Sequence, residues 1–592
     1  MEKYWQILKQ YKGGLVVSPL LVLITVLCET VQPMFMAEII DNGVMPRDLS
    51  VITRVGTFMI LISLAGLFVN IINVYVSSRI GIGFGTDLRT RLFDKIQQLS
   101  FFDIDKFSSA SLVTRLTSDI SRIQQIVLMS MRLLLRSPLM LAMAVFFVVR
   151  INRELAVVLI AAIPILGGSV YLILSKGFPY FLKVQQKVDQ LNGVVRENLI
   201  NIRVVKSFVR EDFETKKFTR SSEELRDMVI RASNIVVSIF PVMQLVMNLS
   251  ILAILWLGGQ KVMYGELKVG ELISFVNYLA QVLMSLMMLS MIIMSYARAS
   301  ASSKRILEVL DTKPSLTNTQ EGLQDKYRIE KGEVTFDNVG FRYTGGENDD
   351  RPACPPIGFR YTGGENDVLQ HISFRANPGE TIALVGATGS AKSSLVQLIP
   401  RLYDATSGEI RIDGIPVKNY NLDELHARIG MVLQKNELFT GTIIDNLRWG
   451  KPDASMEEIE EAARAAEAHD FICSFTEGYN TLLGRGGINV SGGQKQRICI
   501  ARALLRKPKI LILDDSTSAV DTETELKIRN NLNAMLHDTT VFIITQRINT
   551  MQSADRVIVL EDGEINAIGT PDELIKNSTV YQEIYHSQQV LF

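Results

Sequence analysis

The chain has 592 residues and a mass of 66.2 kDa, with 62 Lys and Arg against 62 Asp and Glu, so its formal net charge is zero. A neutral chain lacks the basic excess of nucleic-acid-binding proteins, and its four scattered cysteines have neither disulfide-framework nor zinc-site spacing. The neutral charge therefore indicates no nucleic-acid partner. The mean hydropathy of +0.19 is high for a soluble chain of this size and points to membrane segments.

The first half of the sequence contains six apolar segments long enough to cross a bilayer. Four of them carry no charged residue over 21 to 25 positions. That length suffices for a hydrocarbon core of about 30 Å at about 1.5 Å per helical residue. The first segment contains Glu29 and Glu38, and the third contains Arg132 and Arg136. The predicted spans are 13–40, 56–78, 126–149, 155–175, 235–257 and 272–296.

Two links between these spans are long and rich in Lys and Arg, namely 79–125 and 176–234. Cytoplasmic loops carry such an excess, so we expect both links, both termini and the soluble half on the cytoplasmic side of the cytoplasmic membrane. Both links show helical spacing. Each is therefore expected to form two helices that run out of the membrane and back, reversing near Phe101–Phe107 and Val205–Phe213, where we expect contact with the soluble half.

Three charged side chains inside the predicted spans allow two interpretations. Glu29 could form a buried ion pair with an arginine or line a water-filled cavity, which would be a structural role. Alternatively Glu29, Arg132 and Arg136 contact the substrate in a membrane cavity, because intramembrane charges usually face a pathway.

The composition becomes polar after Leu310. We therefore expect a transmembrane domain over 1–310, a linker over 311–330 and a soluble domain over 331–592.

An apolar strand predicted over Thr381–Val385 leads directly into a glycine-rich loop and a helical stretch, which is the context of a phosphate-binding loop. Backbone N–H groups of such a loop hold nucleotide phosphates, while the Lys392 ammonium adds a charge and the Ser393 hydroxyl coordinates Mg²⁺. The expected binding residues are Gly386, Ala387, Thr388, Gly389, Ser390, Ala391, Lys392, Ser393 and Ser394.

Two further motifs follow in the same half. A buried strand predicted from Lys509 ends in Asp514 and Asp515, of which Asp514 is expected to belong to the Mg²⁺ shell. Before it comes the run Ser491, Gly492, Gly493 and Gln494. With these motifs in this order the chain resembles the ATP-binding cassette family, specifically the exporter half-transporters in which six spans are fused to one cassette.

The resemblance extends over nearly the whole chain and implies ATP and Mg²⁺ as cofactors. Gln434 corresponds to the family's Q-loop and is implied as a further Mg²⁺ ligand, Asp521 corresponds to the D-loop, and Gln546 to the switch position. In the family two cassettes pair head to tail, so that each ATP lies between one chain's phosphate loop and the other chain's signature, here Ser491–Gln494. Phe101–Phe107 and Val205–Phe213 match the coupling-helix positions.

Three residues depart from the family pattern. Asp515 replaces the catalytic Glu, and its carboxylate is about 1.5 Å shorter in reach, although a general base must lie within about 2.6–3.2 Å of its water. Gln546 replaces the switch His and has no titratable proton. Ala391 replaces a Gly. The pattern resembles the degenerate-site subunit of a heterodimeric bacterial multidrug exporter, whose intact signature would complete the partner's site; a homodimer with two slow sites is the alternative.

A ten-residue segment, 340–349, recurs without change at 358–367. A single perfect pair is no repeat architecture, so a recent duplication is expected. It leaves two candidates for the family's adenine-stacking tyrosine. Strand continuity from Val334 favours Tyr343, and spacing to the phosphate loop favours Tyr361.

The expected fold is a polytopic α-helical membrane domain with six transmembrane helices joined to an α/β P-loop nucleotide-binding domain. The expected function is ATP-driven export of hydrophobic or amphipathic compounds by one half of a heterodimer embedded in the lipid bilayer. The alternatives are a lipid or peptide exporter and an ATP-gated regulatory subunit with little turnover.

Overall fold

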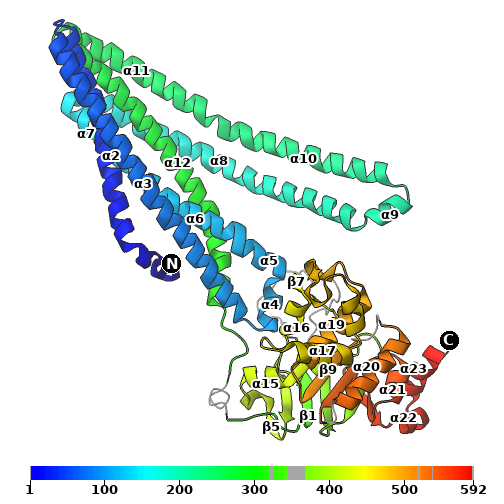
Figure 1. Ribbon diagram of the computed structural model, residues 1–592. Coiled ribbons are helices and arrows are strands. Elements are labelled where there is room, and N and C mark those ends of the chain that lie inside the picture. Colours follow the sequence, from blue (N-terminus) through cyan, green and yellow to red (C-terminus); the bar gives the residue numbers. More distant parts are fainter. Residues whose placement is uncertain (1, 319–325, 344–366, 516–519, 536–537, 590–592) are drawn as a thin grey trace. The chain divides into compact units, whose positions relative to one another are not determined.

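The computed structural model describes residues 2–318, 326–343, 367–515, 520–535 and 538–589, and it divides into two compact units (Figure 1). The first unit comprises Met1–Lys95 and Leu112–Asp311, and the second comprises Ile96–Ser111 and Thr312–Phe592. Residue Tyr361 lies outside the described residues, as does most of the duplicated segment.

The first unit is built from long helices. Six helical runs of the described chain are long and apolar enough to cross a membrane, which confirms the six predicted spans: Lys3–Val44, Leu49–Gln97, Ser109–Ile151, Arg153–Ile200, Glu211–Met263 and Val269–Leu289. The α-helices are α1 (Glu2–Leu8), α2 (Lys12–Glu38), α3 (Leu49–Gln97), α5 (Ser109–Thr114), α6 (Ile120–Met129), α7 (Arg136–Ile151), α8 (Arg153–Ile200), α9 (Ile202–Ser207), α10 (Glu211–Val237), α11 (Ile239–Met263) and α12 (Val269–Asp311).

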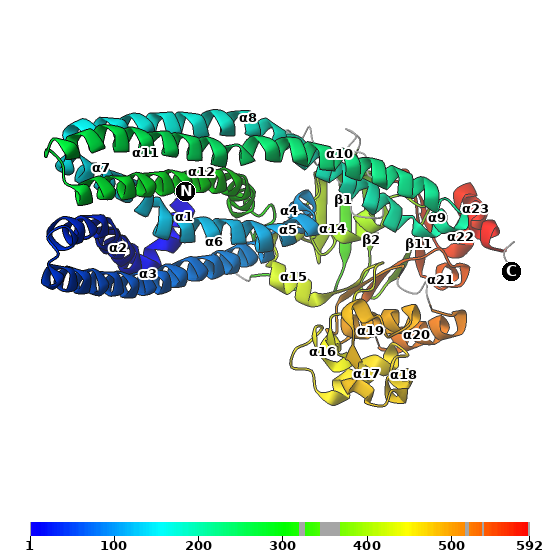
Figure 2. The same ribbon diagram turned by 90° about the horizontal axis from the view of Figure 1, so that it is seen from above.

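These helices pack through apolar side chains with a few buried hydrogen bonds. Helix α12 packs against α2 and α7, and α8 lies along α10 and α11 (Figure 2). The Tyr278 ring on α12 stacks on Phe147 of α7 with centroids 5.7 Å apart, and its hydroxyl donates to the Thr30 carbonyl of α2 at 2.8 Å. The Tyr278 hydroxyl thus has a hydrogen-bond acceptor inside an otherwise apolar contact.

The third span is interrupted, although the sequence predicts it as one segment over 126–149. A π-helical turn, η4 (Ser130–Leu134), separates α6 from α7. Two further π-helical turns occur at η2 (Ile39–Val44) and η3 (Arg115–Asp119), and η1 (Lys9–Tyr11) is a 3₁₀ turn. The π-helical turns are wider than an α-helix, are rare, and often occur at functional sites. One of them, η4, contains Arg132.

Both long links contain a short helix at the expected reversal. Helix α4 (Phe101–Phe107) spans the predicted range and begins with a capping box between Ser100 and Asp103. The second link turns at α9 and the residues after it, where Phe208 and Val209 are 72% and 80% exposed. Exposed apolar side chains at a helical tip indicate a surface that another protein part covers.

The second unit contains a six-stranded sheet in the order β12-β11-β3-β10-β9-β6, which is parallel except at β12, and a four-stranded antiparallel sheet β2-β1-β4-β5. The strands are β1 (Val334–Phe341), β2 (Leu369–Ala376), β3 (Thr381–Val385), β4 (Ser407–Ile412), β5 (Ile415–Pro416), β6 (Ile429–Val432), β7 (Gly441–Thr442), β8 (Leu482–Leu483), β9 (Ile510–Asp514), β10 (Thr540–Ile544), β11 (Arg556–Glu561) and β12 (Glu564–Gly569).

Helices cover the parallel sheet of this unit, as α/β architecture requires of strands that are apolar on both faces. The α-helices of this unit are α14 (Lys392–Leu398), α15 (Leu422–Arg428), α16 (Ile443–Arg448), α17 (Met456–Ala465), α18 (His469–Ser474), α19 (Gly492–Leu504), α20 (Thr522–Met535), α21 (Ile548–Gln552), α22 (Pro571–Asn577) and α23 (Thr579–Gln589). Of these, α14, α15, α19, α21 and α22 contact strands of the parallel sheet. The predicted strand at Thr381–Val385 is confirmed as β3, buried in the centre of the sheet.

Candidate nucleotide site

The predicted phosphate-binding loop connects β3 to α14 at the carboxyl end of the parallel sheet. Its glycines have backbone angles that favour glycine, with φ of +150° at Gly386 and +94° at Gly389, and a Cβ on Gly386 would lie 2.1 Å from the Leu560 carbonyl oxygen. The Lys392 ammonium donates to the carbonyl oxygens of Gly386 at 3.0 Å and Ala387 at 2.8 Å. The loop therefore curls around one positive charge, which suits it to a nucleotide phosphate.

Ala391, where the resembling family has glycine, adopts the left-handed conformation with φ +67° and ψ +20°. It is buried and belongs to the apolar core of the domain. A residue with a Cβ is strained in this conformation by about 1–2 kcal/mol. The departure noted in the sequence thus falls on a position whose backbone is better suited to glycine.

The Ala391→Gly variant is expected to be more stable than the parent by about 1 kcal/mol, since relief of the left-handed strain exceeds the added entropy of the unfolded glycine. This corresponds to a rise of about 2 °C in the melting temperature of the cassette. Ala387→Gly is the matched control, because Ala387 is exposed in the same loop and has no positive φ. An equal or greater rise for Ala387→Gly would contradict the strain argument.

The two residues expected at the Mg²⁺ ion lie together. The Ser393 hydroxyl donates to Asp514 Oδ1 at 3.1 Å, and burial raises the pKa of the Asp514 carboxyl. A hydroxyl and a carboxylate are the oxygen ligands that Mg²⁺ prefers, so this pair fits the ion. Gln434, the third expected ligand, is exposed two residues after β6, the edge strand beside β9.

The residues at the family's catalytic positions follow neighbouring parallel strands. Asp514 and Ile544 are register partners at the ends of β9 and β10, and the Asp515 N–H donates to the Ile544 carbonyl at 3.1 Å. Gln546 is exposed two residues beyond β10. Since β10 also pairs with β3, the strand register places Asp515 and Gln546 at the sheet edge from which the phosphate loop leaves.

Tyr343 follows β1, and its hydroxyl lies 3.0 Å from the Ser394 hydroxyl at the start of α14. Tyr343, one of the two candidates for the adenine-stacking tyrosine, therefore lies next to the phosphate loop. The Tyr343 ring meets the Tyr403 ring edge-on with centroids 5.3 Å apart, and the Tyr403 hydroxyl donates to Asp105 of α4 at 3.1 Å. Sequence motifs missed Tyr403, because nothing in the primary structure relates it to a residue 298 positions earlier.

Under the exporter function that the resemblance implies, the Tyr403→Phe variant is expected to weaken the stimulation of ATP hydrolysis by amphipathic compounds. It removes the hydroxyl that reaches α4 and keeps the ring against Tyr343, at a cost of about 1 kcal/mol, or about fivefold in the stimulation ratio. The measurement is ATP hydrolysis with and without an amphipathic compound. Tyr585→Phe, which removes a hydrogen bond to Gln552 elsewhere in this unit, should leave the ratio unchanged. If basal hydrolysis fell and the stimulation ratio stayed the same, the Tyr403–Asp105 hydrogen bond would not connect α4 to the nucleotide site.

The Ser-Gly-Gly-Gln run begins α19 with a complete capping box. The Gln494 N–H donates to the Ser491 hydroxyl at 3.3 Å, and the Ser491 N–H donates to Gln494 Oε1 at 2.9 Å. Asp521 similarly caps α20 through the Thr524 N–H at 2.9 Å. Among the described residues, no hydrogen bond joins 491–494 to the phosphate loop of the same chain, and both glycines of the run, Gly492 and Gly493, have ordinary backbone angles.

Comparisons with known proteins agree with this geometry. Residues 15–286 match the ABC transporter transmembrane region, and 369–518 match the ABC transporter domain. The ABC transporter ATP-binding protein YfiB of Bacillus subtilis is 40% identical over 589 residues, which is 99% of this chain and 98% of YfiB. The chain belongs to the ABC transporter family.

Other relatives and a solved structure extend over most of this ABC transporter chain. The putative multidrug export ATP-binding/permease protein YgaD of Bacillus subtilis is 32% identical, covering 100% of this chain and 99% of YgaD. The ATP-dependent lipid A-core flippase of Syntrophus aciditrophicus is 31% identical, covering 93% and 88%. A bacterial Atm1-family ABC exporter, solved with ATP bound, has the same fold, with a TM-score of 0.77, 24% identity and 98% of both chains covered.

The charged residues of the transporter's spans are brought together in the first unit. Arg136 of α7 pairs with Glu29 of α2, with its Nη2 2.7 and 2.8 Å from the two carboxylate oxygens. Arg132 and Arg136 line a cavity of about 150 Å³, and Glu29 does not. The ion pair expected under the structural interpretation is therefore present for Arg136, whereas Arg132 faces the cavity with serine hydroxyls and a carbonyl as its partners.

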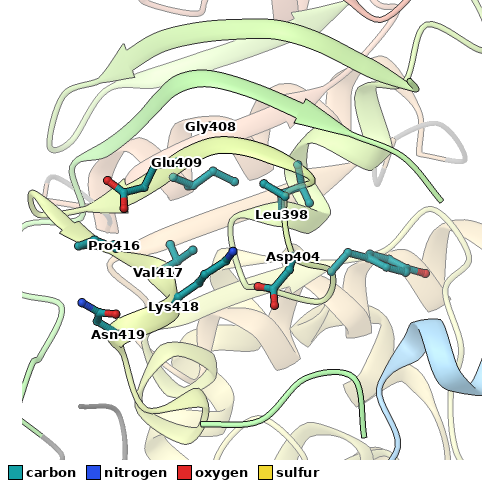
Figure 3. A pocket seen from close by; sticks show the side chains of 11 residues that line it. Leu398, Asp404, Gly408, Glu409, Pro416, Val417, Lys418 and Asn419 are labelled. Atoms are coloured by element: carbon teal, nitrogen blue, oxygen red, sulfur yellow. The ribbon is translucent and has the colours of Figure 1, made fainter. Parts of the chain in front are cut away.

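A cavity of about 170 Å³ also occurs in the nucleotide-binding unit of the transporter, between α14 and the strands β4 and β5 (Figure 3). Its lining includes Leu398, Asp404, Glu409, Val417, Lys418 and Asn419. No residue of the phosphate loop, 386–394, lines it. This cavity therefore does not include the phosphate loop, although Tyr403, which also lines it, packs against Tyr343.

Proposed function

We propose that this chain is one half of an ATP-driven exporter that moves hydrophobic or amphipathic compounds outward across the cytoplasmic membrane. The proposal is supported by the family, by the exporter fold and by the multidrug export that is named for the relative YgaD. The Lys- and Arg-rich links support an orientation with both termini and the nucleotide-binding unit in the cytoplasm.

In this proposal ATP is held by the loop 386–394 with Tyr343 stacked on its adenine. Ser393, Asp514 and Gln434 would hold Mg²⁺, which supplies positive charge at the phosphates. The Lys392 ammonium is already held at the loop, and burial lowers its pKa although Asp514 and Asp515 oppose the effect. Because its contacts with the Gly386 and Ala387 carbonyls already place it in the loop, it can meet an incoming phosphate without a large rearrangement.

The partner is a different half-transporter, whose own phosphate loop meets the Ser491–Gln494 run of this chain. The observation that carries this step is the contrast between an intact, fully capped signature and two substituted residues, Asp515 and Gln546, at the hydrolytic edge. An Asp is shorter than a Glu and a Gln carries no titratable proton, so this chain's own site is expected to bind ATP and hydrolyse it slowly.

Native mass spectrometry of the tagged chain, gently extracted from its host membrane, tests the partner. A 1:1 complex with a second protein of similar mass, carrying Glu and His at the corresponding positions, is the expected result. A homodimer of twice 66.2 kDa would contradict the heterodimer. Asp515 and Gln546 would then have to support turnover themselves.

A lipid exporter is the second candidate, and it is favoured by the lipid A-core flippase among the relatives and by two arginines at a membrane cavity. Transport of a fluorescent phospholipid and of an anionic amphipathic dye into inverted vesicles separates the two candidates. ATP binding that changes conformation without turnover or flux of either compound would instead favour an ATP-gated regulatory subunit.

A further inference from the structure

Polar side chains from all four surrounding elements line the cavity between α2, α3, η4 and α7. Two guanidinium groups, Arg132 and Arg136, line it together with Thr25, Asn70 and Asn73, while Val22, Val74 and Leu133 complete it. Its volume of about 150 Å³ is well below the roughly 300–1,000 Å³ of sites that enclose a drug-sized molecule. The cavity therefore has room for a small polar group and not for a whole amphipathic compound.

The cavity wall carries an excess of positive charge. Glu29 pairs with Arg136, so one carboxylate offsets one of the two arginines. Among the described residues, no carboxylate lies within ion-pair distance of Arg132, whose guanidinium donates to Ser77 Oγ at 2.7 Å, Ser78 Oγ at 2.5 Å and the Val74 carbonyl at 3.0 Å. Arg132 is half-buried, and a charge inside a membrane span with only neutral partners favours an anionic ligand.

A donor also remains unused at this cavity. Arg136 Nε is buried and has no hydrogen-bond partner among the described residues, although both of its carboxylate contacts are made through Nη2. Arg132 lies in the π-helical turn η4, a rare geometry that re-aims side chains and is frequent at functional sites. The unpaired Arg136 Nε and the π-helical turn are observations independent of the excess positive charge. Both also indicate a ligand site at this cavity.

The helices fix the depth of the cavity. Val22 follows Lys12, the first residue of α2, by ten residues, or about 15 Å of helix, in a hydrocarbon core of about 30 Å. Arg132 precedes Arg150 by eighteen residues, or about 27 Å along the third span. With the termini on the cytoplasmic side, the arginines lie in the inner half of the membrane.

From these observations we propose that Arg132 and Arg136 form a binding site for the anionic headgroup, phosphate or carboxylate, of an amphiphile that enters from the inner leaflet. The inference rests on the proposed export function and narrows its substrates to amphiphiles that carry a negative charge. Each guanidinium offers paired N–H donors in the planar geometry that phosphate and carboxylate oxygens accept. The small cavity holds the head, and the apolar tail remains outside it.

The test is equilibrium binding of dodecyl phosphate to the full complex in phosphatidylcholine nanodiscs, without ATP. Arg132→Gln should weaken binding at least tenfold, whereas Arg132→Lys, which keeps the charge, should stay within about threefold of the parent. Arg150→Gln removes the same charge from an exposed position at the outer end of α7 and should have no effect. Val74→Phe fills the cavity without changing its charge and should also weaken binding. It replaces Arg132→Gln as the test if that variant does not fold.

Three outcomes would overturn the proposal. Dodecyl phosphate could bind equally to the parent and Arg132→Gln. Dodecyltrimethylammonium could bind with the same dependence on Arg132, which would exclude recognition of negative charge. Inorganic phosphate alone could bind with that dependence, which would make this a site for a free anion and not for an amphiphile. Because binding is measured without ATP, failure here leaves the ATPase and partner tests of the export function intact.

Discussion

Replacing Ser491 by Asp is expected to lower ATP hydrolysis by the assembled transporter about 100-fold. In the proposed dimer the start of α19 faces the γ-phosphate bound by the partner, where a hydrogen-bond donor would become a negative charge. Loss of one such donor typically costs about 10²–10³ in rate. Asp is as good a helix cap as Ser, so the capping interaction with the Gln494 N–H is retained. The measurement is ATP turnover of the purified complex.

The matched control for this experiment is Asp515→Asn in the same chain. If this chain's own site contributes little to turnover, that change should lower hydrolysis by less than about twofold. Ser491→Thr should remain active, because it keeps both the hydroxyl and the cap. A loss of activity from Asp515→Asn as large as that from Ser491→Asp would show that this chain hydrolyses ATP itself, and the degenerate-site proposal would fail.

The double variant Asp515→Glu, Gln546→His is expected to raise ATP hydrolysis at this chain's own site by tenfold or more. The Glu carboxylate reaches about 1.5 Å further, and correctly positioned acid–base groups contribute about 10²–10⁴-fold to such rates. The parallel register of β9 and β10 places both positions at the same edge of the sheet, so we expect both changes to act on one site. The rate is measured in a complex whose other hydrolytic site carries a Glu→Gln change.

Each single variant is the control for the pair. Asp515→Glu alone should give part of the gain, and Gln546→His alone little, because the His needs a reacting water already placed by the carboxylate. Asp515 also has a positive φ of 46°, a conformation in which the short Asp side chain is favoured over Glu. If the double variant gains nothing while ATP still binds, the backbone at position 515 and not the side-chain length limits hydrolysis.

The sequence predicted the parts of this protein that depend on local pattern. Apolar runs of bilayer length, four of them without a charged residue, predicted the six spans, since few other structures bury such segments. The phosphate loop was predictable because its glycines and Lys392 must stand at fixed offsets between a strand and a helix. Helix α4 was predictable because a link with helical spacing at both ends has to reverse near its middle.

Other features depend on contacts between distant segments and were beyond such patterns. The third span was predicted as continuous, and its π-helical turn at Ser130–Leu134 has no known sequence signal. The sequence could not decide whether Glu29 pairs with Arg132 or Arg136. The two arginines are four residues apart, so a shift of about one helical turn along the axis would bring one to the place of the other. The Tyr403–Asp105 hydrogen bond joins a loop to helix α4, two segments of ordinary composition far apart in the sequence, so only the folded chain reveals it.

The covalent joints between the two units differ in stiffness. Contacts assign Ile96–Ser111 to the nucleotide-binding unit, so the chain passes from one unit to the other after Lys95, Ser111 and Asp311. The first two passages occur inside helices, α3 and α5, and the third at the end of α12. Helix α3 alone is about 74 Å long. Only Gln98–Ser100 separate α3 from α4, so a displacement of α4 has little chain in which to be absorbed before it reaches α3, whereas the passage after Asp311 leads into residues that form neither helix nor strand.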